Sequence, residues 1–206
     1  MIEKLDLKKQ PGLFYQPSPK QPQIVNLPTM NFLMIDGTGN PNTSTLYQQA
    51  VEALYSVSYT LKFTCKKELG KDYGVMPLEG LWWGTRIDQH VFSEADKDQF
   101  QWTMMIMQPD FITPEMVERA TREAAAKKDL PLAANLRFES FTEGTVVQIM
   151  HIGPFDTEGP TVETMHNFAF EQGYHLRGKH HEIYLSDPRR TDPSKWKTIV
   201  RHPIEK

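Results

Sequence analysis

The run Met30-Asn31-Phe32-Leu33-Met34-Ile35, followed by Asp36-Gly37-Thr38-Gly39, begins the part of the chain that decides the fold. The apolar run predicts a strand, and the glycines predict a turn directly after it. Ser44 or Thr45 can cap a helix to about residue 63, since apolar residues then recur at steps of three and four. Two further strands are predicted at about 76–85 and 100–108.

The same order of elements returns later in the chain. A β-branched run over 145–152 predicts a strand, Gly153-Pro154 predicts a turn, and a helix ends at Gly173. Two closing strands are predicted near 180–185 and 196–202. The repeated order occupies about 30–108 and 145–203. We therefore predict an α+β fold of two β-α-β-β modules with antiparallel sheets in a pseudo-twofold arrangement, and a ligand cleft at the pseudo-axis.

The segments outside the two modules have their own signals. Thr113-Pro114-Glu115 is a strong helix start, which predicts a connector helix over about 114–128, with a strand near 136–141 after it. Five prolines in residues 1–28 predict an arm without regular elements. Its apolar residues Leu13, Phe14 and Tyr15 predict that this arm lies on the body of the protein. Residues 29–206 are expected to form a single domain.

Composition excludes several classes of function. Hydrophobic residues make up 39% of the 206, enough for a sizeable core, so the chain as a whole is not disordered. With 26 acidic and 23 basic side chains and a net charge of -3, it lacks the basic surface of a nucleic-acid binder. The single cysteine, Cys65, rules out an intramolecular disulfide. No signal peptide or long apolar run is visible, so we expect a cytoplasmic protein without a membrane span.

Two glutamates lie inside apolar, aromatic strands. Glu79 belongs to Pro77-Leu78-Glu79-Gly80-Leu81-Trp82-Trp83, and Glu182 belongs to His181-Glu182-Ile183-Tyr184-Leu185. An ionised group without a partner is expensive to bury, so each is paired, protonated or turned towards a cleft or solvent. Because both lie in the third element of their module, we expect the cleft at the pseudo-axis to receive both. An apolar pocket would raise the pKa of such a carboxyl group and suit it as a general base or as a partner for a cationic ligand.

Aromatic side chains gather on the neighbouring elements. Tyr55 and Tyr59 are four residues apart, hence on one face of the first helix, and Trp102 lies on the strand after the two tryptophans. Strict alternation places Trp83 with Glu79 and Trp82 opposite, but a bulge at Gly80 would reverse this, so either tryptophan remains possible. Each ring also fits an ordinary core. Together they suit planar hydrophobic ligands.

Other chemistry is weakly supported by the sequence. There is no HExxH motif among the seven histidines, and His180 and His181 are adjacent on a strand and so face opposite ways. Gly37-Thr38-Gly39 lacks the third glycine and the lysine of a nucleotide-binding loop. We therefore predict no metal and no cofactor. Arg189-Arg190 in the last hairpin is most simply a solvated loop.

Three motifs together resemble a known family. They are Tyr55-x3-Tyr59-x-Leu61-Lys62-Phe63, the strand Pro77–Trp83 quoted above, and Glu182-Ile183-Tyr184-Leu185-Ser186-Asp187-Pro188-Arg189-Arg190. The chain is thereby identified as a member of the GyrI-like small-molecule-binding family, over about residues 30–203. The resemblance implies two strand-helix-strand-strand modules (the SHS2 type) and a cleft for lipophilic, often cationic, compounds. Glu182 matches the acidic residue of that cleft. The proline-rich segment before the first predicted strand does not resemble the helix-turn-helix segment of the family's transcription regulators, so we expect no direct transcriptional control.

Stand-alone members that are similar to this chain, and share a strand like Leu78–Trp83, include hydrolases of cyclopropanoid DNA-alkylating toxins, so the resemblance implies a detoxifying enzyme. By that resemblance Glu182 would act as the base, Tyr55 would donate a hydrogen bond or position water, and Glu79 would be the partner acid. Five aromatic residues would line the slot: Trp82, Trp83, Trp102, Tyr59 and Tyr184. The alternatives are a non-enzymatic protein that binds or sequesters drugs, and a gyrase-inhibitor-like module that binds a protein partner.

Overall fold

The strand-turn-helix-strand-strand order predicted from the sequence is present twice. In the computed structural model, which describes residues 4–12, 14–84 and 94–206, the first copy consists of β3 (Met30–Thr38), α1 (Thr45–Glu68), β5 (Leu78–Trp83) and β6 (Gln101–Gln108). The second copy consists of β8 (Gly144–Ile152), α3 (Gly159–Glu171), β10 (His180–Tyr184) and β11 (Lys197–Glu205). The prediction of two β-α-β-β modules is confirmed, although Thr85 at the end of one predicted strand lies outside the described residues.

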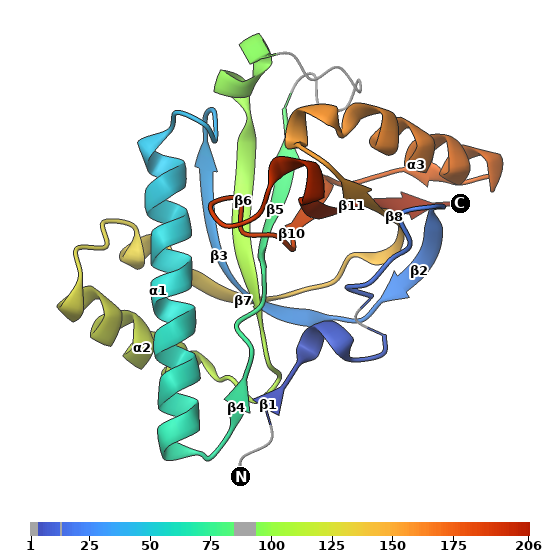
Figure 1. Ribbon diagram of the computed structural model, residues 1–206. Coiled ribbons are helices and arrows are strands. Elements are labelled where there is room, and N and C mark those ends of the chain that lie inside the picture. The colour runs from blue at the N-terminus through green and yellow to red at the C-terminus, as the bar shows by residue number, and fades with distance from the viewer. Residues whose placement is uncertain (1–3, 13, 85–93) are drawn as a thin grey trace.

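Both modules contribute to one antiparallel sheet in the order β2-β8-β11-β10-β5-β6-β3-β7 (Figure 1). Within each module the last strand lies between the other two: β6 lies between β3 and β5, and β11 lies between β8 and β10. The third elements, β5 and β10, pair with each other and join the modules. Outwards from the β5–β10 pair, both directions give the last strand of a module, then its first strand, and then an edge strand. This symmetry confirms the pseudo-twofold arrangement. β7 (Arg137–Phe141) extends one edge, and short β9 (His175–Leu176) pairs with β11.

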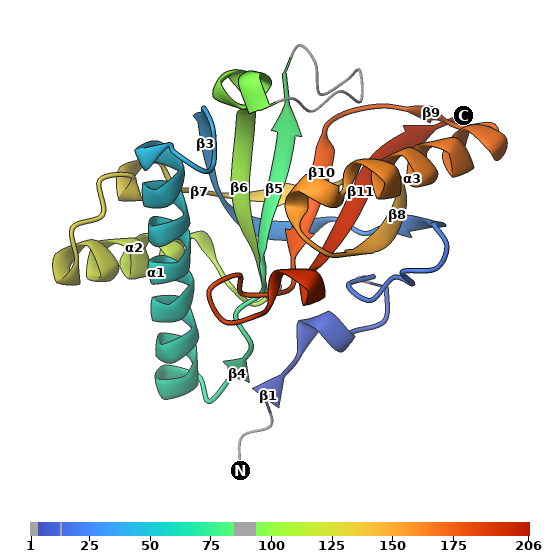
Figure 2. The same ribbon diagram turned by 45° about the horizontal axis from the view of Figure 1, so that its top comes forward.

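Helices α1 and α3 cover the same face of the sheet (Figure 2). Ser44 caps α1 by accepting a hydrogen bond from the backbone N–H of Tyr47 at 3.3 Å. The apolar stripe of α1 continues to Cys65, which explains why the helix ends at Glu68, beyond the predicted end near 63. The connector helix α2 (Pro114–Lys127) packs against α1 and is capped by Thr113, as predicted. Within the described part of the chain, none of the helices combines the length and apolarity needed to cross a membrane.

The N-terminal arm is more regular than its prolines suggested. Residues 23–27 form β2 (Gln23–Leu27), which pairs with β8, and β1 (Lys4–Leu5) pairs with β4 (Asp72–Tyr73). The expectation of no regular element in 1–28 is therefore wrong. The five residues of β2 contain no proline, and an edge strand needs hydrogen bonds on one side alone. The expectation that the arm lies on the body is confirmed, because Tyr15 is buried and the Gln148 side chain donates to the Phe14 carbonyl at 3.1 Å.

Gly37 was expected in a turn, but it is paired within β3, opposite Trp102 of β6. A Cβ at Gly37 would lie 2.1 Å from Cη2 of the fully buried Trp102 ring. The indole therefore packs directly on the glycine backbone.

Gly37→Ala is expected to lower the free energy of unfolding by about 1–3 kcal/mol, because the rigid indole must move to accept a methyl group. Chemical denaturation followed by far-UV circular dichroism measures the change. Gly159→Ala is the matched control, since a Cβ there meets no atom within 4 Å. Equal stability of the two variants would contradict this account of Gly37.

Candidate functional site

The register of β5 against β10 separates the two glutamates. Glu182 is directly opposite Gly80, whereas Glu79 is directly opposite Ile183. Residues that pair directly share a face, and neighbours along a strand alternate between faces. Glu182 therefore lies on the face covered by α1 and α3, and Glu79 lies on the other face. The expectation that one cleft receives both glutamates is wrong. The same alternation places Trp82 with Glu182 and Trp83 with Glu79.

A hydrogen-bonded chain surrounds Glu182 on the helix-covered face. The Trp82 indole N–H donates to the Tyr184 hydroxyl at 3.0 Å, and that hydroxyl donates to Oε2 of Glu182 at 2.7 Å. Burial, followed by the charge of Glu182, raises the pKa of Tyr184 well above its ordinary value, so Tyr184 remains a donor. The Glu182 side chain keeps 16% of its surface exposed, so its carboxylate remains accessible.

A second carboxyl group, Glu158, adjoins this chain. It directly precedes α3 and is 6% exposed. Its Oε1 has no hydrogen-bond partner among the described residues, although Thr198 is close enough to lower its pKa. Burial and the charge of Glu182 outweigh Thr198 and raise the pKa of Glu158 well above its ordinary value. A buried carboxyl group with a raised pKa and a partly exposed carboxyl group therefore lie in the same region, the arrangement used in general acid and base chemistry.

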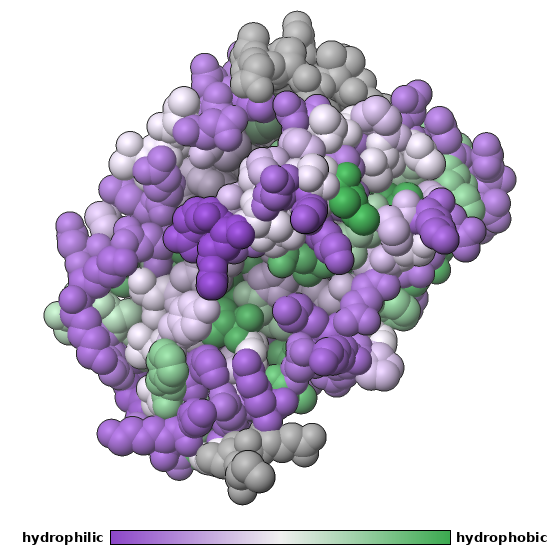
Figure 3. All heavy atoms as spheres, in the orientation of Figure 1, coloured by the Kyte–Doolittle hydropathy of each residue, from purple (hydrophilic) through white to green (hydrophobic). Residues whose placement is uncertain are grey.

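Aromatic rings flank the two carboxyl groups. Tyr47 of α1 stacks on Trp82 with ring centroids 6.2 Å apart. On the α3 side, Phe155 contacts Tyr184 edge-on at 5.6 Å and Trp196 at 4.8 Å. We call Tyr47, Trp82, Glu158, Glu182, Tyr184 and Phe155 the helix-side site. The helix-bearing surface around it exposes hydrophobic residues between hydrophilic ones (Figure 3).

The other predicted site residues lie at varied positions. Tyr55 is half-buried on α1, and it is near enough to contribute to the raised pKa of Tyr47, after burial and Glu182. Tyr59 is 46% exposed and stacks with Tyr55 at 6.3 Å. Trp102 is fully buried beneath Tyr47, so it supports the site from the core. Trp83 lies on the opposite face under the Lys179 ammonium, 3.3 Å from the ring centroid.

Glu79 belongs to a separate buried cluster on the opposite face. Its Oε1 accepts from the Tyr15 hydroxyl at 2.5 Å, and its Oε2 is 3.0 Å from Nε2 of His181. The other ring nitrogen of His181 is 3.0 Å from Oε2 of Glu143, to which Arg201 also donates at 3.2 Å. We call Tyr15, Glu79, Glu143, His181 and Arg201 the arm-side network. It joins the arm, the β7–β8 turn, and both modules.

The charges of the arm-side network balance one another. Burial alone would lower the pKa of His181, but Glu143 and Glu79 raise it to about 9. Burial alone would raise the pKa of Glu143, but His181 and Arg201 lower it to about 2. Two carboxylates and two cations thus neutralise one another inside the protein. These mutual charge contacts indicate a structural role for the residues of the arm-side network, although Oε1 of Glu143 and Nη2 of Arg201 have no hydrogen-bond partner in the described part of the chain.

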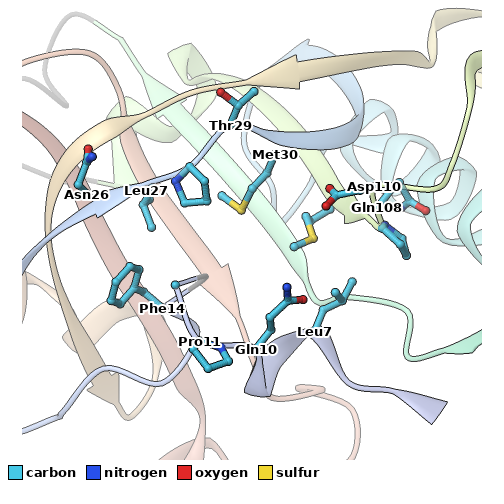
Figure 4. Close-up of a pocket in the computed structure, with 14 residues that line it drawn as sticks. Leu7, Gln10, Pro11, Phe14, Asn26, Leu27, Thr29, Met30, Gln108 and Asp110 are labelled. Carbon is cyan, nitrogen blue, oxygen red and sulfur yellow. The ribbon is translucent and has the colours of Figure 1, made fainter. Parts of the chain in front are cut away.

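A cavity of about 490 Å³ lies on the arm side of the sheet (Figure 4). Its described lining comes from the arm, β2 and the adjoining ends of β3 and β6, and it includes Leu7, Phe14, Met30 and Met107. Asp110 is the one charged residue in that described lining, and no residue predicted from the sequence to form the site is part of it.

Comparison with known proteins agrees with the observed architecture. Residues 20–205 match the model of the GyrI-like small molecule binding domain. An uncharacterized conserved protein from Listeria innocua is 41% identical over 98% of this chain and 100% of its own, with a TM-score of 0.88. A hydrolase from Listeria innocua is 40% identical over the same shares, with a TM-score of 0.85. The C-terminal domain of EcmrR shares the fold at 13% identity, covering 90% of this chain and 98% of its own, with a TM-score of 0.56. No curated protein matches the chain.

The fold and the helix-side site define an α+β small-molecule-binding domain built from two β-α-β-β modules. The chain belongs to the GyrI-like small molecule binding domain family, as its motifs indicated.

Three residues of the helix-side site were not predicted from the sequence. Tyr47 precedes the tyrosine motif, and Phe155 and Glu158 lie in a short segment before α3 with no strand or helix pattern. The one available signal was an acidic residue close to a glycine turn and a helix start, which is common at helix N-termini.

Ionisation of His181 should make the stability of the protein depend on pH. The pKa of His181 is about 9 in the folded protein, against an ordinary value of 6.5. The stabilisation is therefore complete below about pH 6.5 and is lost as the pH rises to about 9, by on the order of 3 kcal/mol. Urea unfolding at a series of pH values measures this loss. It should be absent in His181→Gln and retained in His175→Gln, which changes an exposed histidine. A wild-type stability that does not fall across this range would contradict the assignment.

Proposed function

We propose that the helix-side site binds flat lipophilic compounds and hydrolyses cyclopropanoid alkylating agents. The observation that carries the proposal is the carboxyl pair of Glu158 and Glu182, one with a strongly raised pKa, between aromatic rings from both modules. The likeness to a Listeria innocua hydrolase over the whole chain supports the enzymatic form of the proposal.

Binding would use the rings and the negative charge together. Tyr47 and Trp82 on one side, and Phe155 and Tyr184 on the other, offer aromatic surface to a planar ligand. Glu182 is partly exposed between them and would attract a positive charge on the ligand. The same features suit many lipophilic molecules, so the ring system of the ligand matters less than its flatness.

The chemical step would be the opening of a strained three-membered ring conjugated with a dienone. Water attacks a ring carbon, and a carbon–oxygen bond forms as one carbon–carbon bond of the ring breaks. The electron pair of that bond moves through the dienone, and the carbonyl oxygen becomes a phenolate. Glu182 accepts the proton of the attacking water, and the phenolate takes up a proton from Glu158 or solvent. The ring strain lowers the barrier, so orientation of the water supplies much of the acceleration.

The remaining side chains would position these groups. Tyr184 holds Oε2 of Glu182 by its 2.7 Å hydrogen bond, and Oε1, which is 3.4 Å from Nε2 of His180, would accept the proton of the water. Tyr55 remains the proposed donor to the developing oxyanion, and Tyr47 is a further candidate because it contacts Trp82 directly. Glu79 has no part in this scheme, because its partners are Tyr15 and His181 on the opposite face.

Turnover separates hydrolysis from sequestration. Purified protein is mixed with a twentyfold excess of a spirocyclopropyl dienone, and loss of the dienone absorbance is followed. We expect complete consumption with a ring-opened, water-added product. Consumption of a single equivalent or none would refute hydrolysis and leave the non-enzymatic drug-binding protein as the function, which the aromatic rings also support.

Glu182→Gln is expected to lower kcat by about 10²–10⁴-fold, the usual contribution of a general base, with a smaller effect on KM. Steady-state rates with the dienone measure both constants. Glu163→Gln, an exposed position on the same side of the molecule in α3, is the matched control and should keep wild-type rates. Full turnover by Glu182→Gln would remove this residue from the role of base without affecting the fold.

Glu158 should produce the alkaline limb of the pH profile. As the proposed acid, Glu158 must be protonated to act, so kcat should fall as the pH rises through its raised pKa. In Glu158→Gln this limb should disappear and the maximal rate should be lower. A profile of kcat against pH that is identical in the wild type and the variant would contradict an acid role for Glu158.

A further inference from the structure

Three buried histidines come together beneath α3, apart from the residues proposed to act on a ligand. His166 lies on α3, His180 on β10 and His202 on β11. Their exposed fractions are 3%, 3% and 8%. Each offers one ring nitrogen such that all three atoms lie within 4.8 Å of one another. We call these residues the histidine trio.

The trio is held by the framework of the second module. Nε2 of His166 and Nδ1 of His202 are 3.2 Å apart, with ring centroids at 5.0 Å. The ring of His180 is 6.0 Å from that of His202. Two of the three residues are on paired strands, and the third is on α3, whose apolar residues pack with those of β8 and β11, so the backbone positions are fixed by regular structure. Convergence of three elements on one point is typical of ligand sets for metal ions.

An oxygen donor stands next to the trio. Oε1 of Glu182 is 3.4 Å from Nε2 of His180. Three imidazoles and one carboxylate make up a common set of four ligands, and neutral imidazole is the form of histidine that coordinates a metal.

We propose that the histidine trio, with Glu182 as an available fourth ligand, binds one divalent transition-metal ion of the Zn²⁺ class. Imidazole nitrogen selects such ions over Mg²⁺ and Ca²⁺, which prefer oxygen. Zinc–nitrogen bonds of about 2.0–2.1 Å place two ligands of a tetrahedral site about 3.4 Å apart. The close pair is already at 3.2 Å, and the wider contacts would have to shorten from at most 4.8 Å to this spacing when the ion binds.

A cation at this position would also change the electrostatics of the helix-side site. Glu158 and Glu182 share one region, and neither has an ion pair with lysine or arginine among the described residues. A divalent ion beside Glu182 would offset the repulsion between the two carboxyl groups. Metal binding goes beyond the proposed hydrolysis, in which the carboxyl groups act without a metal, and it can be tested with no substrate present.

The experiment uses the purified full chain. The protein is stripped with a chelator, incubated with Zn²⁺ and desalted, and the retained metal is measured by inductively coupled plasma mass spectrometry. We expect about one equivalent, and a rise in Tm on adding Zn²⁺, because an ion that binds the folded state alone stabilises it. Co²⁺ in place of Zn²⁺ should give the intense visible absorption of a tetrahedral site, and Zn²⁺ should abolish it.

The variants His166→Gln and His202→Gln should each lose the retained metal and the Tm shift. His175→Gln, an exposed histidine on β9, is the matched control and should retain both. Failure of the wild type to retain Zn²⁺ and to show the Co²⁺ absorption would overturn the proposal and identify the trio as a hydrogen-bonded histidine cluster. Equal metal retention in the wild type and both trio variants would overturn it as well. The Co²⁺ measurement on the wild type decides the matter even if a variant fails to fold, and turnover of the metal-free protein tests hydrolysis separately.

Discussion

The pairing of β5 with β10 is the constraint on which the rest of the structure depends. It joins the two modules, and its register decides which side chains meet on each face. At its centre Gly80 is opposite Glu182, and a Cβ at Gly80 would lie 2.5 Å from Cε of Met104 and 2.7 Å from Nε1 of Trp82. Because the glycine has no side chain, the Trp82 indole lies across its backbone and reaches the Tyr184 hydroxyl. The hydrogen-bonded chain to Glu182 therefore requires glycine at this point.

The sheet separates two pairs of glutamates whose surroundings differ in charge. On the arm side, Glu79 and Glu143 are matched by His181 and Arg201, so the cluster is neutral and fully buried. On the helix side, Glu158 and Glu182 have no such compensation by arginine or lysine among the described residues, and the pKa of Glu158 rises instead. A compensated pair stabilises a fold, whereas an uncompensated pair retains a reactive proton and an attraction for cations. This difference in charge compensation is the reason for proposing a structural role for the arm-side pair and a chemical role for the helix-side pair.

Local patterns predicted the elements well, because caps and apolar spacing act over a few residues. Ser44 and Thr113 cap the helices as expected, and the repeated order of elements gave the two modules. β2 was not predicted, because the formation of this edge strand depends on pairing with β8 and little on its own sequence. The placement of Glu79 failed for a related reason. The face of the sheet on which a side chain lies depends on the register between two strands about a hundred residues apart. A local sequence pattern carries no information on that register.

The register of the β5–β10 pair also explains why Glu79 and Glu182 are not equivalent. The strands β5 and β10 are antiparallel: Gly80 pairs with Glu182, and the next residue of β5, Leu81, pairs with the preceding residue of β10, His181. Rotation about a twofold axis perpendicular to the sheet keeps every side chain on its own face. Glu79 and Glu182 are on opposite faces, so no such rotation exchanges them, and their similar surroundings in the sequence do not make them equivalent positions. The two modules share a backbone plan but use their third strands differently: β10 presents its carboxylate to the helices, while β5 buries its own against the arm.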